Sequence, residues 1–439
     1  MMKRSYPNQS VKEKTGFLSF VRKVNLEKIL FFLILLFLPT QFGKHFWPDF
    51  SYVSGIRIDY LSPTLYLTDV LISALLILLF IKNLKNGLLN KARKHRTFLI
   101  HAFLITIFLV FNILNSENKL AGIYGIIKIA EFTLFSAVTY IMLKKIKIQN
   151  LLPFFSISVI VQSIISIAQY IRQESLGGVL YFLGERTFSG QTPGIANLSI
   201  DGNLILRPYG TFSHPNVLAG FLLIFLTIIL FKTDFRKKIG SICLIALILG
   251  SVGLLLSFSR LPILLWILSI SVFMYSRFKL SLENKAVVIL ILLAFIFSIA
   301  FYSPFYLRFV QSSLFEESFV LREKLFAHGF SIFAKNPLIG AGVNNYLSGF
   351  VSLGNTFVIQ PVHNVFMLVL IQTGIIGFAG LLFFIYRICV SVFKKKSIYI
   401  KLIFAYVLII GSFDHYFLTL QQGQLMLAFI IGLTLSKNE

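Results

Sequence analysis

Arg207 begins a polar stretch that joins a long polar segment to a long apolar one. Residues 207–220 read RPYGTFSHPNVLAG, so Arg, Thr, Ser, His and Asn stand beside turn-forming Pro and Gly. A guanidinium group at this boundary can bind a phosphate through paired hydrogen bonds, although an Arg that only anchors a helix to lipid phosphates is common. We expect Arg207 to bind substrate. We expect His214 and Asn216 to shape the site rather than react, with Asn216 as the N-cap of the next helix.

Two more arginines lie at similar boundaries. Ser259 and Arg260 occupy a very short connection between two apolar runs, where an unpaired cation is costly and an anionic partner is expected. An Arg that extends to the interface is the alternative for this position. Arg322 lies beside Glu323 and Lys324, so a local ion pair is its ordinary explanation. We therefore favour a functional role for Arg260, whereas Arg322 alone indicates little.

His363 and Asn364 open a later apolar run. The positive end of a helix dipole favours the neutral imidazole, so His363 could accept a proton near neutral pH. A hydrogen-bonded helix cap explains the same pattern equally well. The residues that could carry chemistry are thus several arginines and one candidate base.

The composition indicates where these residues reside. Of 439 residues, 56% are hydrophobic and 13% are charged, and the mean hydropathy is +0.82. Soluble domains carry about 25% charged residues. Repeated apolar runs of about 20 residues predict one all-α, polytopic membrane domain. The net charge of +24 then concerns topology, and nucleic-acid binding is not expected.

Apolar runs predict about twelve transmembrane helices. Their approximate ranges are 26–43, 66–82, 97–115, 120–143, 150–171, 216–232, 239–258, 261–276, 286–302, 363–387, 400–417 and 419–436. Most of the 41 Lys and Arg residues fall on one side of this arrangement, so the positive-inside rule places both termini in the cytoplasm. We expect residues 1–28 to be a cytoplasmic tail and 29–439 to be a single domain in the cytoplasmic membrane. The first run reads as a retained span rather than a signal peptide.

The opposite side carries three long segments, 43–66, 172–215 and 303–362. Long loops on one face of a bundle are where substrate chemistry is usually placed. The third loop, between spans nine and ten, is expected to carry short interfacial helices, because residues 319–333 mix apolar and charged side chains in an amphipathic pattern. Residues 336–342 (NPLIGAG) should end that helix, since Pro lacks an amide donor and Gly permits positive φ.

Several polar residues fall within or at the ends of the spans. They are Lys128, Glu131, Gln162, Gln169, Asp69 and Asp414. The first two are three residues apart, and the two glutamines are seven apart, so each pair shares a helix face that should point into the bundle. Pairing that fixes the bundle is favoured over a proton or ion path. The two aspartates are expected at the outer interface.

No metal or cofactor site is indicated by the sequence. It has no phosphate-binding P-loop, no Cys/His cluster with zinc spacing and no Asp-x-Asp pair among the acids of the long loops. If this face handles a phosphate leaving group, arginines must supply the positive charge.

In their order along the chain, these motifs resemble the O-antigen ligase and polymerase superfamily of bacterial membrane glycosyltransferases. The resemblance rests on Arg207 with residues 210–220, on Ser259-Arg260, on Arg322 upstream of 336–342, and on His363-Asn364 followed by 372–377 (QTGIIG). The motifs lie between about residues 207 and 380, and elsewhere only the span pattern agrees.

The resemblance implies transfer of a glycan from an undecaprenyl-diphosphate carrier to an acceptor hydroxyl at the outer face of the cytoplasmic membrane, without nucleotide sugar, metal or cofactor. Arg207, Arg260 and Arg322 would bind the carrier diphosphate, and His363 would orient or deprotonate the acceptor hydroxyl, which predicts inversion. The residues expected to help bind substrate are His214, Asn216, Ser259 and Asn364. The acceptor could be a glycan, a lipid or a protein, so ligase and polymerase remain open.

A transporter or flippase of a lipid-linked or anionic envelope precursor is the main alternative. Twelve spans and charged residues within them suit it. Transporters usually place substrate groups near the bilayer midplane, however, whereas the polar motifs here gather at one edge. A scaffold without activity is the third possibility.

Overall fold

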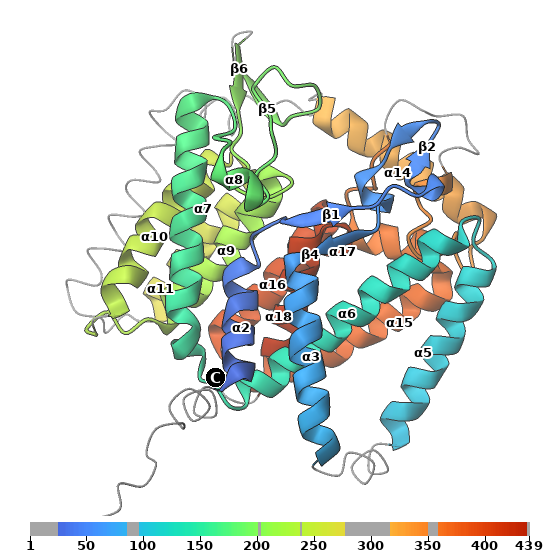
Figure 1. Ribbon diagram of the computed structural model, residues 1–439, viewed down its shortest axis with the longest axis horizontal. Coiled ribbons are helices and arrows are strands. Elements are labelled where there is room, and N and C mark those ends of the chain that lie inside the picture. Colours follow the sequence, from blue (N-terminus) through green and yellow to red (C-terminus); the bar gives the residue numbers. More distant parts are fainter. Residues whose placement is uncertain are drawn as a thin grey trace, which may run out of the picture.

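The computed structural model describes residues 25–85, 96–200, 203–237, 239–276, 317–349 and 359–436, and it is dominated by long helices (Figure 1). The first six long helices are α2 (Leu26–Phe37), α3 (Leu67–Lys85), α5 (Arg96–Leu114), α6 (Lys119–Leu143), α7 (Leu152–Arg172) and α9 (Pro215–Lys232). The next six are α10 (Ile239–Leu256), α11 (Arg260–Ser276), α14 (Glu317–Lys335), α15 (Val365–Lys395), α16 (Ile398–Phe413) and α18 (Gln421–Leu435). Two short helices are α8 (Val179–Phe182) and α17 (Tyr416–Thr419).

Each predicted span within the described residues overlaps one of these helices, although the span predicted at 26–43 ends as a helix at Phe37, and the predicted span 286–302 lies outside the described residues. Five helices in the described part are long and apolar enough to cross a membrane. They cover Lys119–Leu143, Ile148–Arg172, Pro215–Lys232, Ile239–Leu256 and Val365–Lys394. The chain is therefore an all-α membrane protein, and the count of twelve spans stays a prediction.

Helix α9 lies inside the bundle and packs against α7, α10, α11 and α16. Every residue from Val217 to Phe231 is buried, which suits a helix that is apolar on all sides. Its polar Thr227 donates to the Leu223 carbonyl at 2.7 Å and lies 3.0 Å from the Ser269 hydroxyl. Because α9 is enclosed, its N-terminus is a fixed base for the polar stretch that precedes it.

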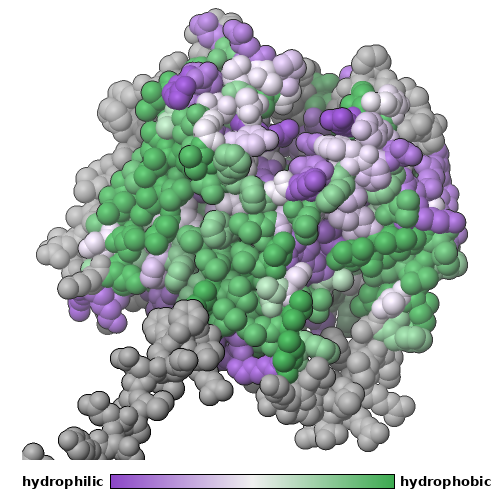
Figure 2. Space-filling model, viewed as in Figure 1, coloured by the Kyte–Doolittle hydropathy of each residue, from purple (hydrophilic) through white to green (hydrophobic). Residues whose placement is uncertain are grey.

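Apolar residues cover the middle of the molecule in Figure 2, and hydrophilic ones gather towards the end where β5, β6 and α14 lie. Helix α5 exposes large apolar side chains, among them Phe103, Leu104 and Ile105. Such a continuous apolar surface is stable against lipid and not against water.

The predicted long loops contain small hairpins rather than only irregular chain. Strand β1 (Gly43–His45) pairs with β4 (Thr64–Tyr66), β2 (Tyr52–Val53) with β3 (Ile56–Arg57), and β5 (Asn197–Ile200) with β6 (Asn203–Leu206), all antiparallel. In the third loop, the described part holds the 19-residue helix α14, which confirms a helix over 319–333. The β5–β6 and β2–β3 hairpins and α14 lie towards one end of the molecule, and the chain's C-terminus lies towards the other (Figure 1).

Residues 336–342 dock onto a break in α15. Gly374 has φ 64° within that helix, and the amides of Ile375 and Ile376 donate to the carbonyls of Pro337 and Leu338 at 2.8 and 3.2 Å. A Cβ on Gly374 would lie 2.3 Å from the Leu338 backbone, so only glycine fits there. Two motifs that are far apart in the sequence therefore form one backbone junction.

Candidate active site

Asp414 is the centre of a buried polar cluster at the end of α16. One carboxylate oxygen accepts from Asn216 Nδ2 at 2.8 Å. The other accepts from the His415 amide at 2.8 Å and lies 3.6 Å from His363 Nδ1. The last distance is longer than a hydrogen bond but within the range of an ion pair. Asp414, expected to be interfacial, is only 8% exposed. It lies between Asn216 of the Arg207 stretch and His363.

Asn216 connects Asp414 to Arg207. Its side-chain oxygen accepts from Arg207 Nη2 at 2.8 Å and from the Ser259 hydroxyl at 3.1 Å. Arg207 Nε donates to the Ser257 carbonyl at 2.9 Å. Arg207 is 7% exposed, so it is not an arginine that anchors a helix to lipid headgroups. The guanidinium is held by the connection that precedes Arg260.

The expectation that Asn216 caps α9 is wrong. The N-cap is His214, whose Nδ1 accepts from the Asn216 amide at 3.1 Å, and Pro215 occupies the first helical position. The proline has no amide to satisfy, and the histidine receives the next one. The Asn216 side chain is thereby available to the cluster.

Two glutamines of α7 hold the loop that carries Arg207. Gln169 Oε1 accepts from the amides of Tyr209 and Gly210 at 3.0 and 2.8 Å. Gln162 accepts from the Thr211 amide at 3.0 Å and donates to its hydroxyl at 2.9 Å. The shared face predicted for these glutamines is confirmed, and its role is to satisfy buried backbone groups.

Asn364 positions His363 at the start of α15. Its Oδ1 accepts from the Met367 amide at 2.9 Å, which makes it the N-cap, and its Nδ2 donates to the Ser412 carbonyl at 3.0 Å. This second bond ties the start of α15 to the end of α16. His363 is thus placed beside Asp414, and the cap of this helix is Asn364 rather than His363.

His415 stands next to His363, with ring centroids 4.9 Å apart. Its Nδ1 lies 2.6 Å from the Thr419 hydroxyl, and Tyr60 packs edge-on at 5.6 Å. Burial and the neighbouring His363 lower the pKa of His415 to about 3, although Asp414 opposes this. Burial and the Arg207 charge also lower the pKa of His214. Both rings are therefore neutral near pH 7.

Asp414 has the opposite balance. Burial raises the pKa of its carboxyl, but His363 and then the other two histidines lower it below the ordinary value. The Asp414 carboxyl is therefore ionised near pH 7.

The other two predicted arginines, Arg260 and Arg322, differ in how directly they approach the Asp414 cluster. Arg260 is the first residue of α11, directly after Ser259 of the cluster. Arg322 lies on α14, and its charge acts on His415. Among the described residues, no ion pair joins Arg322 to the neighbouring Glu323.

Within the described ranges, His363, Asp414 and His415 form a group whose ligand atoms lie within 4.8 Å of one another. Both Asp414 oxygens and His415 Nδ1 already contact protein donors or acceptors. Asp414 and His415 are also adjacent in sequence. The arrangement suits proton transfer through an Asp–His pair better than a metal centre with several open ligands.

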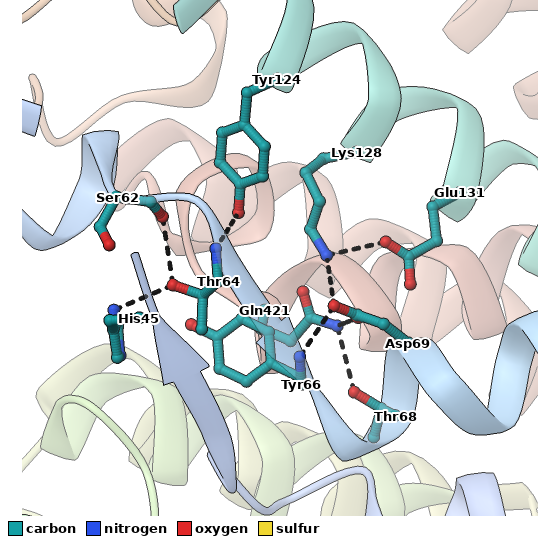
Figure 3. A network of polar contacts seen from close by, with 10 residues as sticks. All are labelled: His45, Ser62, Thr64, Tyr66, Thr68, Asp69, Tyr124, Lys128, Glu131 and Gln421. Carbon is teal, nitrogen blue, oxygen red and sulfur yellow. Dashed lines mark hydrogen bonds and ion pairs between the residues drawn. The ribbon is translucent and has the colours of Figure 1, made fainter. Parts of the chain in front are cut away.

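A second polar network lies at the start of α3 (Figure 3). Lys128 Nζ is 2.7 Å from Glu131 and 3.1 Å from Asp69, so the predicted Lys128–Glu131 pair is confirmed and Asp69 is an addition. Gln421 Nε2 donates to the other Asp69 oxygen at 2.5 Å and to Thr68 at 3.1 Å. Asp69 is buried rather than interfacial.

Fold and site together define a helical membrane protein with a buried cluster of arginine, histidine and aspartate where several helices end. Residues 245–382 match the family model described as O-Antigen ligase, so the chain is an O-antigen ligase-like membrane protein and the resemblance is confirmed. The matched segment contains Arg260, Arg322 and His363, whereas Arg207 and Asp414 lie outside it. No curated protein matches the chain.

Proposed function

We propose that this protein is a glycosyltransferase that moves a glycan from an undecaprenyl-diphosphate carrier to an acceptor hydroxyl. The observation that carries the proposal is the position of His363 Nδ1 3.6 Å from the buried Asp414 carboxylate. Asn216 connects that carboxylate to Arg207. A candidate base and a candidate phosphate ligand thus belong to one network, as glycosyl transfer with a phosphate leaving group requires.

In the proposed reaction, the acceptor oxygen attacks the anomeric carbon while the bond from that carbon to the diphosphate oxygen breaks. The electron pair of the broken bond stays on undecaprenyl diphosphate. The acceptor proton passes to His363, and attack opposite the leaving group inverts the anomeric centre. If the Nδ1 proton of His363 faces Asp414, then Nε2 is the atom that accepts the proton.

Asp414 would stabilise the imidazolium that forms. The carboxylate is fixed by Asn216 and by the His415 amide, so it needs no rearrangement when charge develops. Neutral His415 and His214 add no competing positive charge.

Arg207, Arg260 and Arg322 would bind the diphosphate and stabilise the charge that grows on it. Arg207 is oriented in advance by Asn216 and Ser257, which reduces the entropy lost on binding. We infer that this site faces the outer side of the cytoplasmic membrane, with both termini in the cytoplasm, because of the charge distribution. The acceptor is a glycan, a lipid or a protein, and the proposed reaction requires no metal.

The test is transfer by the purified protein in lipid nanodiscs, with undecaprenyl-diphosphate glycan, several acceptors and a chelator. We expect wild type to form product. We expect His363→Ala to reduce kcat by about 100- to 10,000-fold, the range for a lost general base. His45→Ala is the control, because His45 belongs to the β1–β4 hairpin and contacts Thr64 at 2.9 Å. Equal rates for wild type and His363→Ala would contradict the proposed base.

The transporter alternative draws support from the buried Lys128–Asp69–Glu131 charges. Liposomes containing the protein distinguish the two functions. Movement of the lipid-linked glycan between leaflets without a new glycosidic bond would favour the transporter and reject glycosyl transfer.

A further inference from the structure

A cavity of about 640 Å³ lies between α5, α6 and α15. Its apolar walls include Leu104, Phe108, Ile376, Leu381 and Phe384. Leu104, Ile376 and Phe384 are each about half exposed, at 58%, 53% and 45%. The cavity therefore opens sideways on the apolar surface, where a hydrocarbon chain can enter from lipid.

The other end of the cavity is polar. Tyr66, Tyr124, Lys128 and Gln421 line it. In Figure 3, Lys128 and Gln421 contact Asp69, and the Tyr124 hydroxyl accepts from the Thr64 amide. Lys128 is the nearest cation, but it is paired with Asp69 and Glu131, so its positive charge is already offset by carboxyl groups. Asp59, which also lines the cavity, is paired with Arg186 at 3.5 Å. This end therefore disfavours a phosphate.

One acceptor atom at this end lacks a donor. Gln421 Oε1 is buried and accepts no hydrogen bond among the described residues, while its Nε2 is fixed by Asp69 and Thr68. The residue is only 5% exposed and lines the cavity. A buried acceptor without a donor costs free energy, and a ligand hydroxyl would supply the donor.

The polar end also reaches the candidate active site. Thr419 and Tyr60 line the cavity. Thr419 lies 2.6 Å from His415 Nδ1, and Tyr60 packs edge-on against the same ring. His415 in turn packs against His363. Thr419, Tyr60 and His415 thus lie between a ligand head in this cavity and His363.

We propose that this cavity binds the acceptor, as an amphiphile with a neutral, hydroxyl-rich head and a hydrocarbon chain along α5 and α15. This proposal rests on the proposed glycosyl transfer. The arginines attract the diphosphate donor on one side of His363 and His415, whereas the Asp69 network receives hydroxyl groups on the other. The two sides therefore differ in the head group that they favour, a diphosphate beside the arginines and neutral hydroxyl groups beside the Asp69 network.

The experiment uses two photoreactive probes with the same alkyl chain, an alkyl glucoside and an alkyl phosphate. Each is cross-linked to the full-length protein in nanodiscs, and labelled peptides are located by mass spectrometry. We expect the glucoside to label α5 and α15 at least about fivefold more than the phosphate, a preference of about 1 kcal/mol.

A cavity-filling variant tests the location. Gly380 lines the cavity, and a Cβ there meets no atom within 4 Å, so Gly380→Phe should fill it without disturbing α15. Leu382→Phe is the matched control, because Leu382 is 47% exposed on the same helix but does not line the cavity. We expect labelling by the glucoside to fall at least about fivefold in Gly380→Phe only.

Equal labelling by both probes would overturn the proposed head-group chemistry. Labelling that survives Gly380→Phe would overturn the location. Neither result depends on catalysis, so glycosyl transfer can stand when the acceptor cavity fails. Conversely, selective labelling of a protein that forms no product would leave an amphiphile site while rejecting the proposed function.

Discussion

The Asp414 cluster and the Asp69 network each hold one buried aspartate, but they differ in how they are built. Asp414 is surrounded by Asn216, two histidines and, through Asn216, Arg207. Asp69 is surrounded by Lys128 and Gln421, with Glu131 adding a second carboxyl group beside Lys128. The Asp414 cluster contains an imidazole whose charge can change during a reaction, whereas the lysine of the Asp69 network is already paired with carboxyl groups.

The two regions also differ in their position on the helices. The Asp414 cluster uses helix ends, where Pro215, Arg260, Asn364 and Asp414 begin or terminate elements. Helix ends leave backbone groups and space for a ligand. The Lys128–Glu131 pair lies within α6, where the backbone is already satisfied. This contrast supports the proposed proton transfer in the first region and the proposed recognition of hydroxyl groups in the second.

The strongest test of the contrast replaces each aspartate by asparagine. In Asp414→Asn the candidate base loses the charge that stabilises its protonated form, so kcat for glycosyl transfer should fall roughly 100- to 1,000-fold. In Asp69→Asn the Lys128–Glu131 pair remains, so kcat should stay within about threefold, while KM for the acceptor should rise because Asp69 no longer fixes Gln421 with a charged oxygen. Both are measured by product formation in nanodiscs.

Equal losses of kcat in the two variants would contradict the contrast between the Asp414 cluster and the Asp69 network. Folding is checked separately by thermal unfolding. If Asp414→Asn also unfolds the protein, Asp414→Glu separates the two effects. This variant keeps the charge and should recover part of kcat.

The sequence predicts the helices well because long apolar runs with basic flanks admit few other structures. It also predicts the Lys128–Glu131 pair, since residues three apart share a helix face. Asp69 could not be added to that pair, because it lies 59 positions from Lys128 and the packing of α3 against α6 brings them together.

The centre of the candidate site could not be predicted for the same reason, because it too joins residues that are far apart in the sequence. The sequence singles out Arg207 and His363, but nothing local indicates that Asp414 joins them. Its signal was a carboxylate at a span end, which also fits an interfacial residue. The sequence predicts Asn216 as the N-cap of α9 because Asn is a common N-cap. Pro215 instead occupies the first helical position, which makes His214 the N-cap.

A smaller effect is expected from Arg207→Lys. Lysine keeps the positive charge, but it cannot donate from both Nε and Nη2 to Ser257 and Asn216 at once. We expect kcat/KM for the lipid-linked donor to fall about 10- to 100-fold, in line with the loss of charged hydrogen bonds. Arg172→Lys is the control, because Arg172 is an exposed arginine paired with Glu174 at 2.7 Å. Full activity in Arg207→Lys would leave Arg207 with a purely structural role.

The smallest effect concerns acid stability and compares one histidine from each region. Burial and His363 lower the pKa of His415 to about 3, below the value of about 6.5 in the unfolded chain. Between these values the unfolded chain binds more protons, so stability falls as the pH drops below about 6.5. By pH 5 the free energy of unfolding falls by up to about 2 kcal/mol through His415.

His45, beside Thr64 near the Asp69 network, is only half-buried. Burial lowers its pKa too, but its contribution to acid sensitivity should be smaller. The apparent unfolding temperature, measured in nanodiscs from pH 7.5 to 5, should therefore depend less on pH in His415→Gln than in wild type, with a smaller change in His45→Gln. If His45→Gln had the larger effect, the buried neutral histidines of the Asp414 cluster would not be what makes this protein sensitive to acid.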